Sequence, residues 1–263
     1  MLRPSPVDLD QFLHRLADAS GEAIMPFFRS SLAALDKSQN GSFDPVTEAD
    51  KAAEVVIRRM IREAFPSHAI HGEEFDDESG TSEFGWVIDP IDGTKAFISG
   101  LPVWGTLIGL TRNGKAARGL MNQPFTRERF WGDGGKAQWR GPTGERTLRT
   151  RPCASFGEAT LMTTTPAMFK GDAAQRYQSL ERLVRLPRYG CDCYAYCMLA
   201  AGHVDLVVEA GLKAVDIVPL IPIIEGAGGV ATTWRGEPVT SGGDVIVAGD
   251  KRLHEHALKI LGG

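Results

Sequence analysis

Two carboxylates stand three residues apart at the end of the apolar run in the segment WVIDPIDGT. Pro90 fixes the backbone between Asp89 and Asp92, and Gly93 and Thr94 follow directly. We expect a strand to end here and a helix to begin, so that free backbone N–H groups lie beside the carboxylates. Carboxylates bind cations and helix-start amides bind anions. The spacing therefore predicts a place where metal ions and a phosphate group meet.

Other acidic residues could reach this pair from distant parts of the chain. Glu73 and Glu74 end the short apolar segment HAIHGEE, which could pair beside the strand that carries Asp89. Asp216 lies in the apolar run LKAVDIVPLIPII, where a carboxylate is rarely buried without a partner or a metal. Hard cations such as Mg²⁺ take several oxygen ligands, which favours one shared site. Structural alternatives stay open, because each acid could instead be a helix cap or a surface residue.

Helical periodicity and strand-like segments predict the elements that must position these acids. Residues 8–29 have apolar side chains at helical spacing, and Thr47 and Asp50 form a capping signature before a second helix that ends at Phe65. Strands are expected in HAIHGEE and at residues 86–90, 104–110, 117–122, 128–131 and 137–139. The first half is therefore predicted to be two helices laid against a multistranded sheet.

The order of elements changes after about residue 150. Strands and helices are expected to alternate at residues 159–163, 173–183, 185–189, 195–202, 205–209 and 218–227, before a last strand at 245–249 and a last helix at 251–261. This alternation predicts an α/β second half behind an α+β first half. The boundary is placed after residue 145, which gives the units 1–145 and 146–263.

Length and composition exclude several classes of protein. With 263 residues, of which 43% are hydrophobic and 24% charged, the chain is expected to form a globular core rather than a disordered or fibrous structure. The net charge of -4 and the absence of a Lys/Arg-rich block argue against nucleic acid as a partner. No apolar run reaches the ~20 residues of a membrane span, and the N-terminus lacks the apolar core of a signal peptide. We therefore expect a cytoplasmic protein without a membrane partner.

Three of the four cysteines, Cys191, Cys193 and Cys197, lie within one short segment. Such a cluster could ligate zinc, but no nearby histidine completes a set of four ligands, since His203 follows a helical run. Buried, reduced thiols near the start of a helix are the favoured interpretation.

Four segments together carry a resemblance to a known family. DPVTEAD, GEE, WVIDPIDGT and VDLVVEAGLKAVDIVPLIPIIEGAGG, in this order, resemble the inositol monophosphatase superfamily of Mg²⁺-dependent, lithium-sensitive phosphatases over nearly the whole chain. The resemblance implies a layered αβαβα sandwich, commonly a homodimer, that acts on a small phosphate monoester.

The resemblance also implies a set of metal ligands. A first Mg²⁺ would be held by Glu73, Asp89 and the backbone carbonyl of Ile91, and a second by Asp89, Asp92 and Asp216. A third, weaker ion would depend on Glu73 and waters. Two to three Mg²⁺ ions suit phosphate monoester hydrolysis, since they can acidify a water and neutralise the charge that develops on the leaving oxygen.

Catalytic and phosphate-binding residues follow from the same match. Asp50 and Thr94 correspond to a carboxylate–hydroxyl pair that orients the attacking water, and Glu73 completes the catalytic set. The backbone amides of Gly93 and Thr94 would hold the phosphate. Lys37 corresponds weakly to a lysine in a family loop.

The second half resembles one branch of the superfamily, the histidinol-phosphate phosphatases, through RYGCDCYAYCMLAAGHVDLVVEAGLK. Glu209 matches the position that contacts the substrate away from the phosphate, and Asp216 borders the same pocket. Asp192 falls where inositol-specific members have a small neutral residue. An added carboxylate favours the ammonium and imidazole of histidinol phosphate over an uncharged polyol. A helix cap is the alternative role for Asp192.

Histidinol-phosphate phosphatase is therefore the predicted activity, with an inositol or broad-specificity sugar or nucleotide monophosphatase as the alternative. A non-catalytic binding module that has kept the fold is disfavoured, because every implied metal-binding position is intact.

Overall fold

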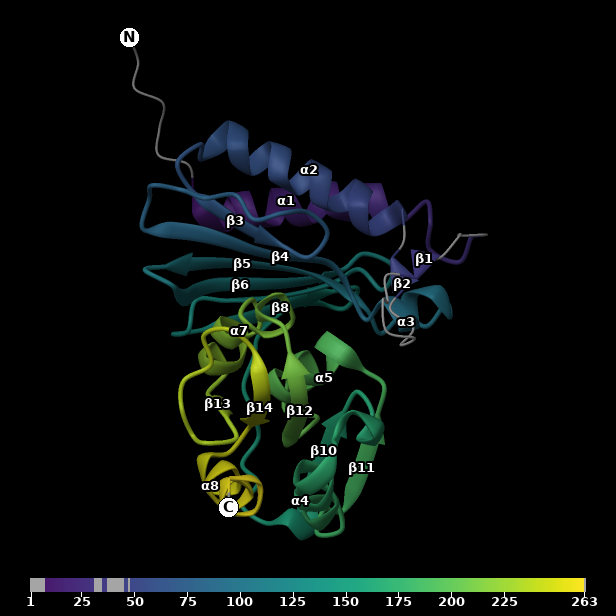
Figure 1. Cartoon of the computed structure of the whole chain (residues 1–263), viewed down its shortest axis with the longest axis vertical. Helices are drawn as coiled ribbons and strands as arrows, with labels where there is room; N and C mark the ends of the chain where they lie inside the picture. The colour runs from purple at the N-terminus through teal and green to yellow at the C-terminus, as the bar shows by residue number, and fades with distance from the viewer. Residues whose placement is uncertain (1–7, 31–34, 37–44, 47, 263) are drawn as a thin grey trace.

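The computed structural model describes residues 8–30, 35–36, 45–46 and 48–262. Two large sheets lie between three layers of helices, as Figure 1 shows from α2 at the top to α4 and α8 at the bottom. This is the αβαβα sandwich that the sequence predicts. The capping Thr47 and the loop residue Lys37 lie outside the described residues.

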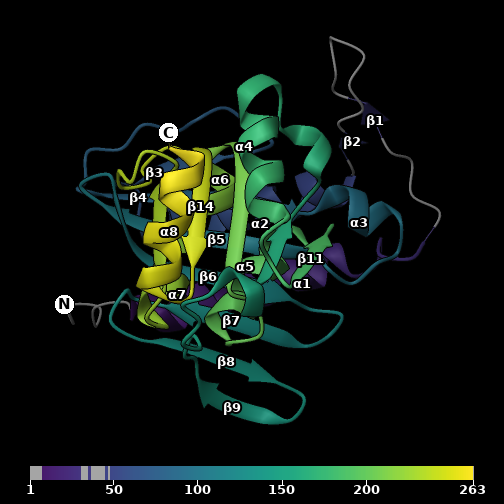
Figure 2. The same ribbon diagram turned by 90° about the horizontal axis from the view of Figure 1, so that it is seen from below.

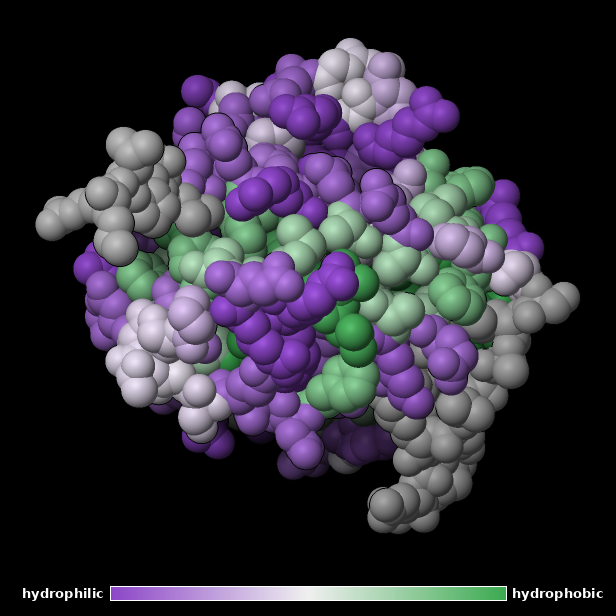
Figure 3. Space-filling model, turned by 90° about the horizontal axis from the view of Figure 1, so that it is seen from above, coloured by the Kyte–Doolittle hydropathy of each residue, from purple (hydrophilic) through white to green (hydrophobic). Residues whose placement is uncertain are grey.

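The first layer is formed by α1 (Leu9–Ile24) and α2 (Glu48–Ala64), which pack against each other and against one face of the first sheet. Both helices turn apolar residues such as Phe12, Leu16, Ile57 and Ile61 inward, as amphipathic helices on a sheet must. Their outer face is mostly hydrophilic, with a paler hydrophobic band across the middle of the view in Figure 3. The two predicted helices are thus confirmed.

The first sheet has seven strands in the order β3-β4-β5-β6-β7-β8-β9, in which only the β3–β4 pair is parallel. Its strands are β3 (Ala69–Gly72), β4 (Phe84–Asp92), β5 (Gly105–Arg112), β6 (Lys115–Gln123), β7 (Glu128–Gly132), β8 (Ala137–Gly141) and β9 (Gly144–Thr147). Strand β9 was not expected, because its four residues are all exposed and have no apolar alternation. The boundary proposed after residue 145 falls within it.

The second sheet has five strands in the order β11-β10-β12-β14-β13. Its strands are β10 (Thr160–Thr163), β11 (Leu186–Tyr189), β12 (Leu206–Leu212), β13 (Val230–Thr233) and β14 (Gly243–Ala248). The helices α5 (Asp192–Ala200), α6 (Ala214–Ile217) and α7 (Ile221–Gly226) lie between the two sheets, and α4 (Gly171–Glu181) and α8 (Lys251–Leu261) cover the outer face (Figure 2). A two-stranded sheet, β1 (Leu35–Asp36) with β2 (Pro45–Val46), and the short helix α3 (Thr94–Ile98) complete the chain's larger elements.

The helix predicted at residues 218–227 is present as the shorter α7, which starts only at Ile221. The short helix α6 before it was not predicted; Pro219 lies between the two, and Pro222 is in the first turn of α7. Proline lacks the N–H that would continue α6, so the helix ends and restarts. The turn packs closely on the first sheet, since a Cβ atom added at Gly109 would lie 3.1 Å from Pro219 Cα. This break brings the N-terminal end of α6, with Asp216, toward the first sheet.

Among the described residues, no helix is both long enough and apolar enough to cross a membrane.

Candidate active site

The segment with the two spaced carboxylates forms the end of β4 and the start of α3. Pairing of β4 with β5 is irregular between Asp89 and Asp92, so both carboxylates leave the regular alternation of the strand. Gly93 follows with φ 86°, a left-handed backbone conformation that glycine adopts readily. A Cβ atom at this position would lie 3.2 Å from Asp192 Oδ2 and 3.3 Å from Trp104 Cα. The expected strand-to-helix junction is confirmed, and a glycine is required in it.

Three carboxylates from distant parts of the sequence converge at this junction. Asp89, Asp92 and Asp216 each offer an oxygen atom, and these atoms lie within 4.8 Å of one another. Backbone amides orient two of them: Cys193 N donates to Asp92 Oδ2 at 2.6 Å, and Lys213 N donates to Asp216 Oδ2 at 2.7 Å. The convergence predicted for Asp216 is therefore present.

Glu73 lines the same cavity from the loop after β3. A buried ion pair on α2 fixes this loop: Glu54 Oε2 accepts from Glu74 N at 2.8 Å, and Arg58 Nη2 donates to the Phe75 carbonyl at 2.9 Å. Arg58 and Glu54 bond to each other at 2.7 Å and are almost fully buried. The helix α2 thus holds the strand end that presents Glu73 to the cluster.

The acids of the cluster repel one another strongly. Burial, reinforced by the charges of Glu73, Asp92 and Asp216, raises the pKa of Asp89 well above its usual range. Burial also raises the pKa of Asp92, with Asp192 and Asp216 adding to the effect. The pKa of Asp216 is raised to about 6, again mainly by burial.

An all-oxygen set of donors fits hard divalent cations. Asp89 is 2% exposed, and its Oδ1 atom has no hydrogen-bond partner among the described residues. Buried carboxylates in this state are stabilised by a bound cation, which reverses the mutual repulsion. The backbone carbonyl of Ile91 faces the same cavity and accepts a hydrogen bond from Thr94 Oγ1 at 3.1 Å.

Asp50 lies on α2, buried, and its charge contributes to the raised pKa of Asp89. Thr94 lines the cavity. The two partners of the expected carboxylate–hydroxyl pair therefore come from the first turns of two helices, Asp50 from α2 and Thr94 from α3.

A second acidic group, Asp192 and Glu209, lines the same cavity, and the Asp192 carboxylate lies beside Gly93. Thr164 N donates to Glu209 Oε1 at 2.6 Å, and Thr164 Oγ1 donates to Asp192 Oδ1 at 3.3 Å. Asp192 and Glu209 therefore face the same cavity as the cluster, Glu209 from β12 and Asp192 from the start of α5. Burial raises the pKa of Glu209 to about 8 and also raises that of Asp192.

The helix-cap alternative for Asp192 is wrong. Cys191 is the N-cap of α5 and its side chain makes no capping bond, while Asp192 is the first residue of the helix and has φ 41°. Its side chain is turned toward Thr164 and the cavity instead. Position 192 thus combines a left-handed backbone with a carboxylate held by a hydroxyl.

Several cavity residues were not predicted from the sequence: Lys95, Thr164, Met168, Cys193, Tyr196 and Lys213. Tyr196 could have been found, because it is four residues after Asp192 on the same helix and so shares its face. Lys213 could have been found by its closeness to Asp216 in the chain, and its Nζ atom lies 2.9 Å from Glu73 Oε1. Thr164 follows a buried strand, and no sequence motif marks it as a site residue.

The four cysteines form no disulfide bond, and Cys193 and Cys197 are buried. In the part of the chain that the structure describes, the only group of potential metal ligands is the one formed by Asp89, Asp92 and Asp216. Buried, reduced thiols are therefore the correct interpretation of Cys193 and Cys197, and Cys191 is half-buried.

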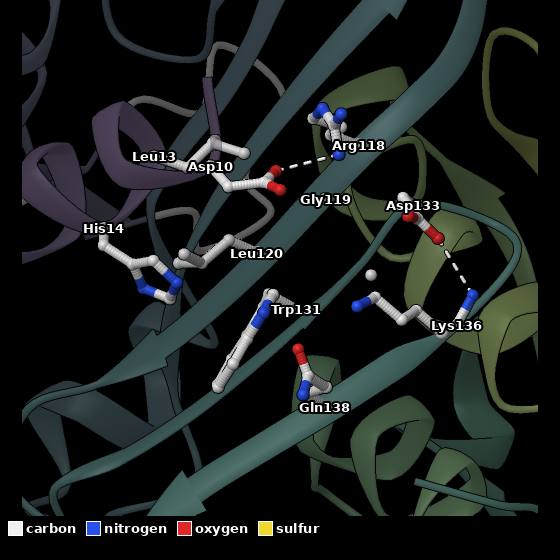
Figure 4. A pocket seen from close by; sticks show the side chains of 11 residues that line it. Asp10, Leu13, His14, Arg118, Gly119, Leu120, Trp131, Asp133, Lys136 and Gln138 are labelled. Carbon is white, nitrogen blue, oxygen red and sulfur yellow. Dashed lines mark hydrogen bonds and ion pairs between the residues drawn. The ribbon is translucent and has the colours of Figure 1, made fainter. Parts of the chain in front are cut away.

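A second cavity lies between α1 and strands β6 to β8 (Figure 4). Its side chains include the ion pair of Asp10 and Arg118 at 2.8 Å, beside His14 and Trp131. With about 50 Å³ it is much smaller than the acidic cavity of about 270 Å³. The smaller cavity could hold water but no phosphate monoester. The acid-lined cavity is the candidate active site because Asp89, Asp92 and Asp216 converge in it.

Two sheets between three layers of helices, with an acid-lined cavity where they meet, define a phosphatase of the layered αβαβα class. A solved inositol monophosphatase from Zymomonas mobilis has this fold, with a TM-score of 0.86 and 38% identity over 99% of this chain and 100% of that one. The chain belongs to the inositol monophosphatase family, whose model matches residues 6–262. The acidic cluster agrees with the metal dependence of this family.

Two curated relatives differ in the activities that their names give. The bifunctional phosphatase IMPL2 of Arabidopsis thaliana is 42% identical over 98% of this chain and 77% of its own length. A histidinol-phosphatase of Streptomyces coelicolor is 34% identical over 98% of both chains. The protein is thus a phosphatase of this family, and its substrate has to be argued from the cavity.

Proposed function

We propose that the protein hydrolyses L-histidinol phosphate to L-histidinol and inorganic phosphate in a Mg²⁺-dependent reaction. The observation that carries this proposal is the second acidic group of the cavity: Asp192 and Glu209 face the acidic cluster and share Thr164 as a hydrogen-bond donor. Histidinol carries an ammonium group and a protonatable imidazole. A substrate of this kind supplies positive charge where the cavity has two buried carboxylates.

The phosphate end of the substrate would meet the acidic cluster. The residues proposed to hold the ions are Glu73, Asp89, Asp92 and Asp216, with the backbone carbonyl of Ile91. Bound Mg²⁺ would neutralise phosphoryl charge and acidify a water. The start of α3 turns the backbone amides of Gly93 and Thr94 toward an anion in the cavity. Thr94 and Asp50 are proposed to orient the attacking water.

The alcohol end of the substrate would meet Asp192 and Glu209. A polyol needs matched donors and acceptors around its ring, whereas a cation gains from each carboxylate that faces it. Thr164 holds both carboxylates at fixed positions through its N–H and its hydroxyl. The arrangement therefore discriminates by charge. The similarity to the inositol monophosphatase from Zymomonas mobilis supports the competing substrate, myo-inositol 1-phosphate.

Steady-state phosphate release at fixed Mg²⁺ separates the two substrates. We expect a higher kcat/KM with L-histidinol phosphate than with myo-inositol 1-phosphate, and loss of both activities in EDTA. Asp192→Asn keeps the shape of the side chain and removes its charge, so it should lower kcat/KM for histidinol phosphate by about 10- to 100-fold. The effect on the inositol ester should stay below about threefold.

Asp172→Asn is a matched control, because Asp172 is also an aspartate in the first turn of a helix but is exposed on α4. This variant should behave as the wild type. A wild-type preference for the inositol ester, or an equal loss of both activities in Asp192→Asn, would contradict the proposed substrate.

A further inference from the structure

One buried hydroxyl in the acid-lined cavity lacks a hydrogen-bond partner among the described residues. Tyr196 is 4% exposed, its side chain lines the cavity, and its Oη atom makes no hydrogen bond there. A buried hydroxyl without a partner costs about 1–3 kcal/mol, so most such groups are paired. A buried, unpaired donor on a residue of the cavity wall points to a ligand that pairs with it.

We infer that Tyr196 contacts the substrate, and that its hydroxyl donates a hydrogen bond to an oxygen or nitrogen acceptor of the alcohol portion of the bound phosphate monoester. The inference rests on the proposed use of this cavity for a phosphate monoester. Tyr196 would thus help to determine specificity, a role that was not predicted for it from the sequence.

Tyr196 lines the cavity from α5, the helix that also carries Asp192. Glu209 lines it from β12, which packs against α5. Because Tyr196 lies on the packed pair of elements that carry the two carboxylates proposed to bind the cation, we expect its hydroxyl to meet the alcohol portion of the substrate.

The hydroxyl of Tyr196 keeps its proton at working pH, so it can donate a hydrogen bond to a substrate oxygen or nitrogen. Burial, followed by the charges of Glu209 and Asp92, raises the pKa of Tyr196 well above its usual range, so the group stays protonated. The other two hydroxyls of the cavity are already engaged. Thr94 Oγ1 bonds the Ile91 carbonyl and Thr164 Oγ1 bonds Asp192. Tyr196 is left as the hydroxyl that is available to a substrate in the described part of the cavity.

A neighbouring tyrosine provides a contrast within the same helix. Tyr194 Oη donates to Glu128 Oε2 and lies 3.0 Å from Thr126 Oγ1, and Tyr194 does not belong to the cavity wall. Both tyrosines are buried on α5. One hydroxyl is therefore satisfied by the protein and the other is not, although size, burial and secondary structure are alike.

Tyr194→Phe and Tyr196→Phe test the inference as a pair. Tyr196→Phe removes an oxygen that has no hydrogen-bond partner among the described residues, so its Tm should equal or exceed that of the wild type. Its kcat/KM should fall about tenfold, the effect of one lost hydrogen bond to substrate. Tyr194→Phe should lower the Tm by a few degrees and leave kcat/KM within about twofold. Both variants are assayed with the ester that the wild type hydrolyses best.

Product inhibition by inorganic phosphate identifies the part of the substrate that is contacted. An unchanged inhibition constant in Tyr196→Phe, together with the lower kcat/KM, supports a contact to the alcohol portion. A parallel weakening of phosphate inhibition overturns that assignment, as does a kcat/KM that stays within twofold of the wild type. If the wild type prefers the inositol ester, the histidinol phosphate proposal fails, while the role of Tyr196 is still decided by that ester.

Discussion

The two acidic groups of the cavity differ in how the chain assembles them. In the cluster at the end of β4, Asp89 and Asp92 come from one short segment and only Asp216 arrives from a distant helix. In the second group, Asp192 and Glu209 come from α5 and β12. A compact motif thus encodes the general chemistry, while substrate choice depends on separate elements that only the folded second half brings together.

The two groups also differ in their supports. Backbone amides orient the cluster: Cys193 N holds Asp92 and Lys213 N holds Asp216. On the substrate side, Thr164 contributes its amide to Glu209 and its hydroxyl to Asp192. Of these four hydrogen bonds, only the one to Asp192 comes from a side chain, the Thr164 hydroxyl, which a mutation can remove. We therefore expect Asp192 to be the most adaptable of the four carboxylates.

Asp89→Asn should have the largest effect. We expect kcat to fall at least about 1,000-fold with every phosphate monoester, because the variant loses a charge from the centre of the proposed metal cluster. Phosphate release measured with L-histidinol phosphate and myo-inositol 1-phosphate checks this. If only one ester lost activity, the cluster would affect substrate choice, and its proposed general role would be wrong.

Thermal unfolding provides a second measurement on Asp89→Asn. The raised pKa of Asp89 means that the folded state without metal loses stability as pH rises above the ordinary aspartate range. In EDTA at pH 7, the variant should therefore unfold at a higher temperature than the wild type. Mg²⁺ should raise the Tm of the wild type and have little effect on the variant. A variant that is less stable in EDTA would argue against repulsion in the cluster.

Glu209→Gln should have an intermediate effect that depends on the substrate and on pH. The pKa of Glu209 is about 8 in the free cavity, and a cationic substrate binds the ionised carboxylate. For wild-type protein, kcat/KM for histidinol phosphate should therefore rise by about tenfold as pH rises from 7 to 9. The glutamine variant should lose this rise, and the inositol ester should show no such difference. A pH–rate profile for each ester measures it.

Glu209→Gln should lower activity at high pH but raise thermal stability there. A carboxyl group whose pKa is raised by folding stabilises the protein below its ordinary pKa and loses that contribution as pH rises through about 8. Glu209→Gln should therefore be more thermostable than the wild type at pH 9 and closer to it at pH 5. If the variant and the wild type differed in Tm by the same amount at pH 5 and pH 9, burial would not raise the pKa of Glu209.

Lys213→Met should have the smallest effect. Its ion pair with Glu73 is largely exposed on the lysine side, and pairs of that kind contribute little. We expect less than a threefold change in the Mg²⁺ concentration for half-maximal activity, measured by titration of Mg²⁺. If this Mg²⁺ concentration changed by more than tenfold, Lys213 would have to be counted with the residues of the metal cluster.

The elements predicted best are those with a strong period and clear ends. The opening helices, the strand that ends at Asp92 and the last helix have regular apolar spacing and correspond to α1, α2, β4 and α8. The exposed strand β9 has no such pattern. The four-residue helix α6 is too short to show a helical period, and Pro219 delays the start of α7 to Ile221, three residues after the predicted start.

Only part of the candidate site could be predicted from the sequence, because several of its contacts depend on how distant elements pack. The convergence of Asp216 with Asp89 and Asp92 was predictable, because a carboxylate among aliphatic residues needs a partner. The hydrogen bonds of Thr164 to Glu209 and Asp192 depend on how β10, β12 and α5 lie together. No local pattern in the chain encodes such an arrangement. The positive φ of Asp192 is likewise imposed by the fold.

The left-handed backbone at position 192 limits how this protein could be given a new specificity. Only glycine, asparagine and aspartate adopt that conformation at low cost, so most amino acids would strain the start of α5. That start also supplies the amide that holds Asp92. Directed evolution at position 192 would therefore have few productive solutions. A library of aspartate, asparagine and glycine at this position would cover nearly all of them.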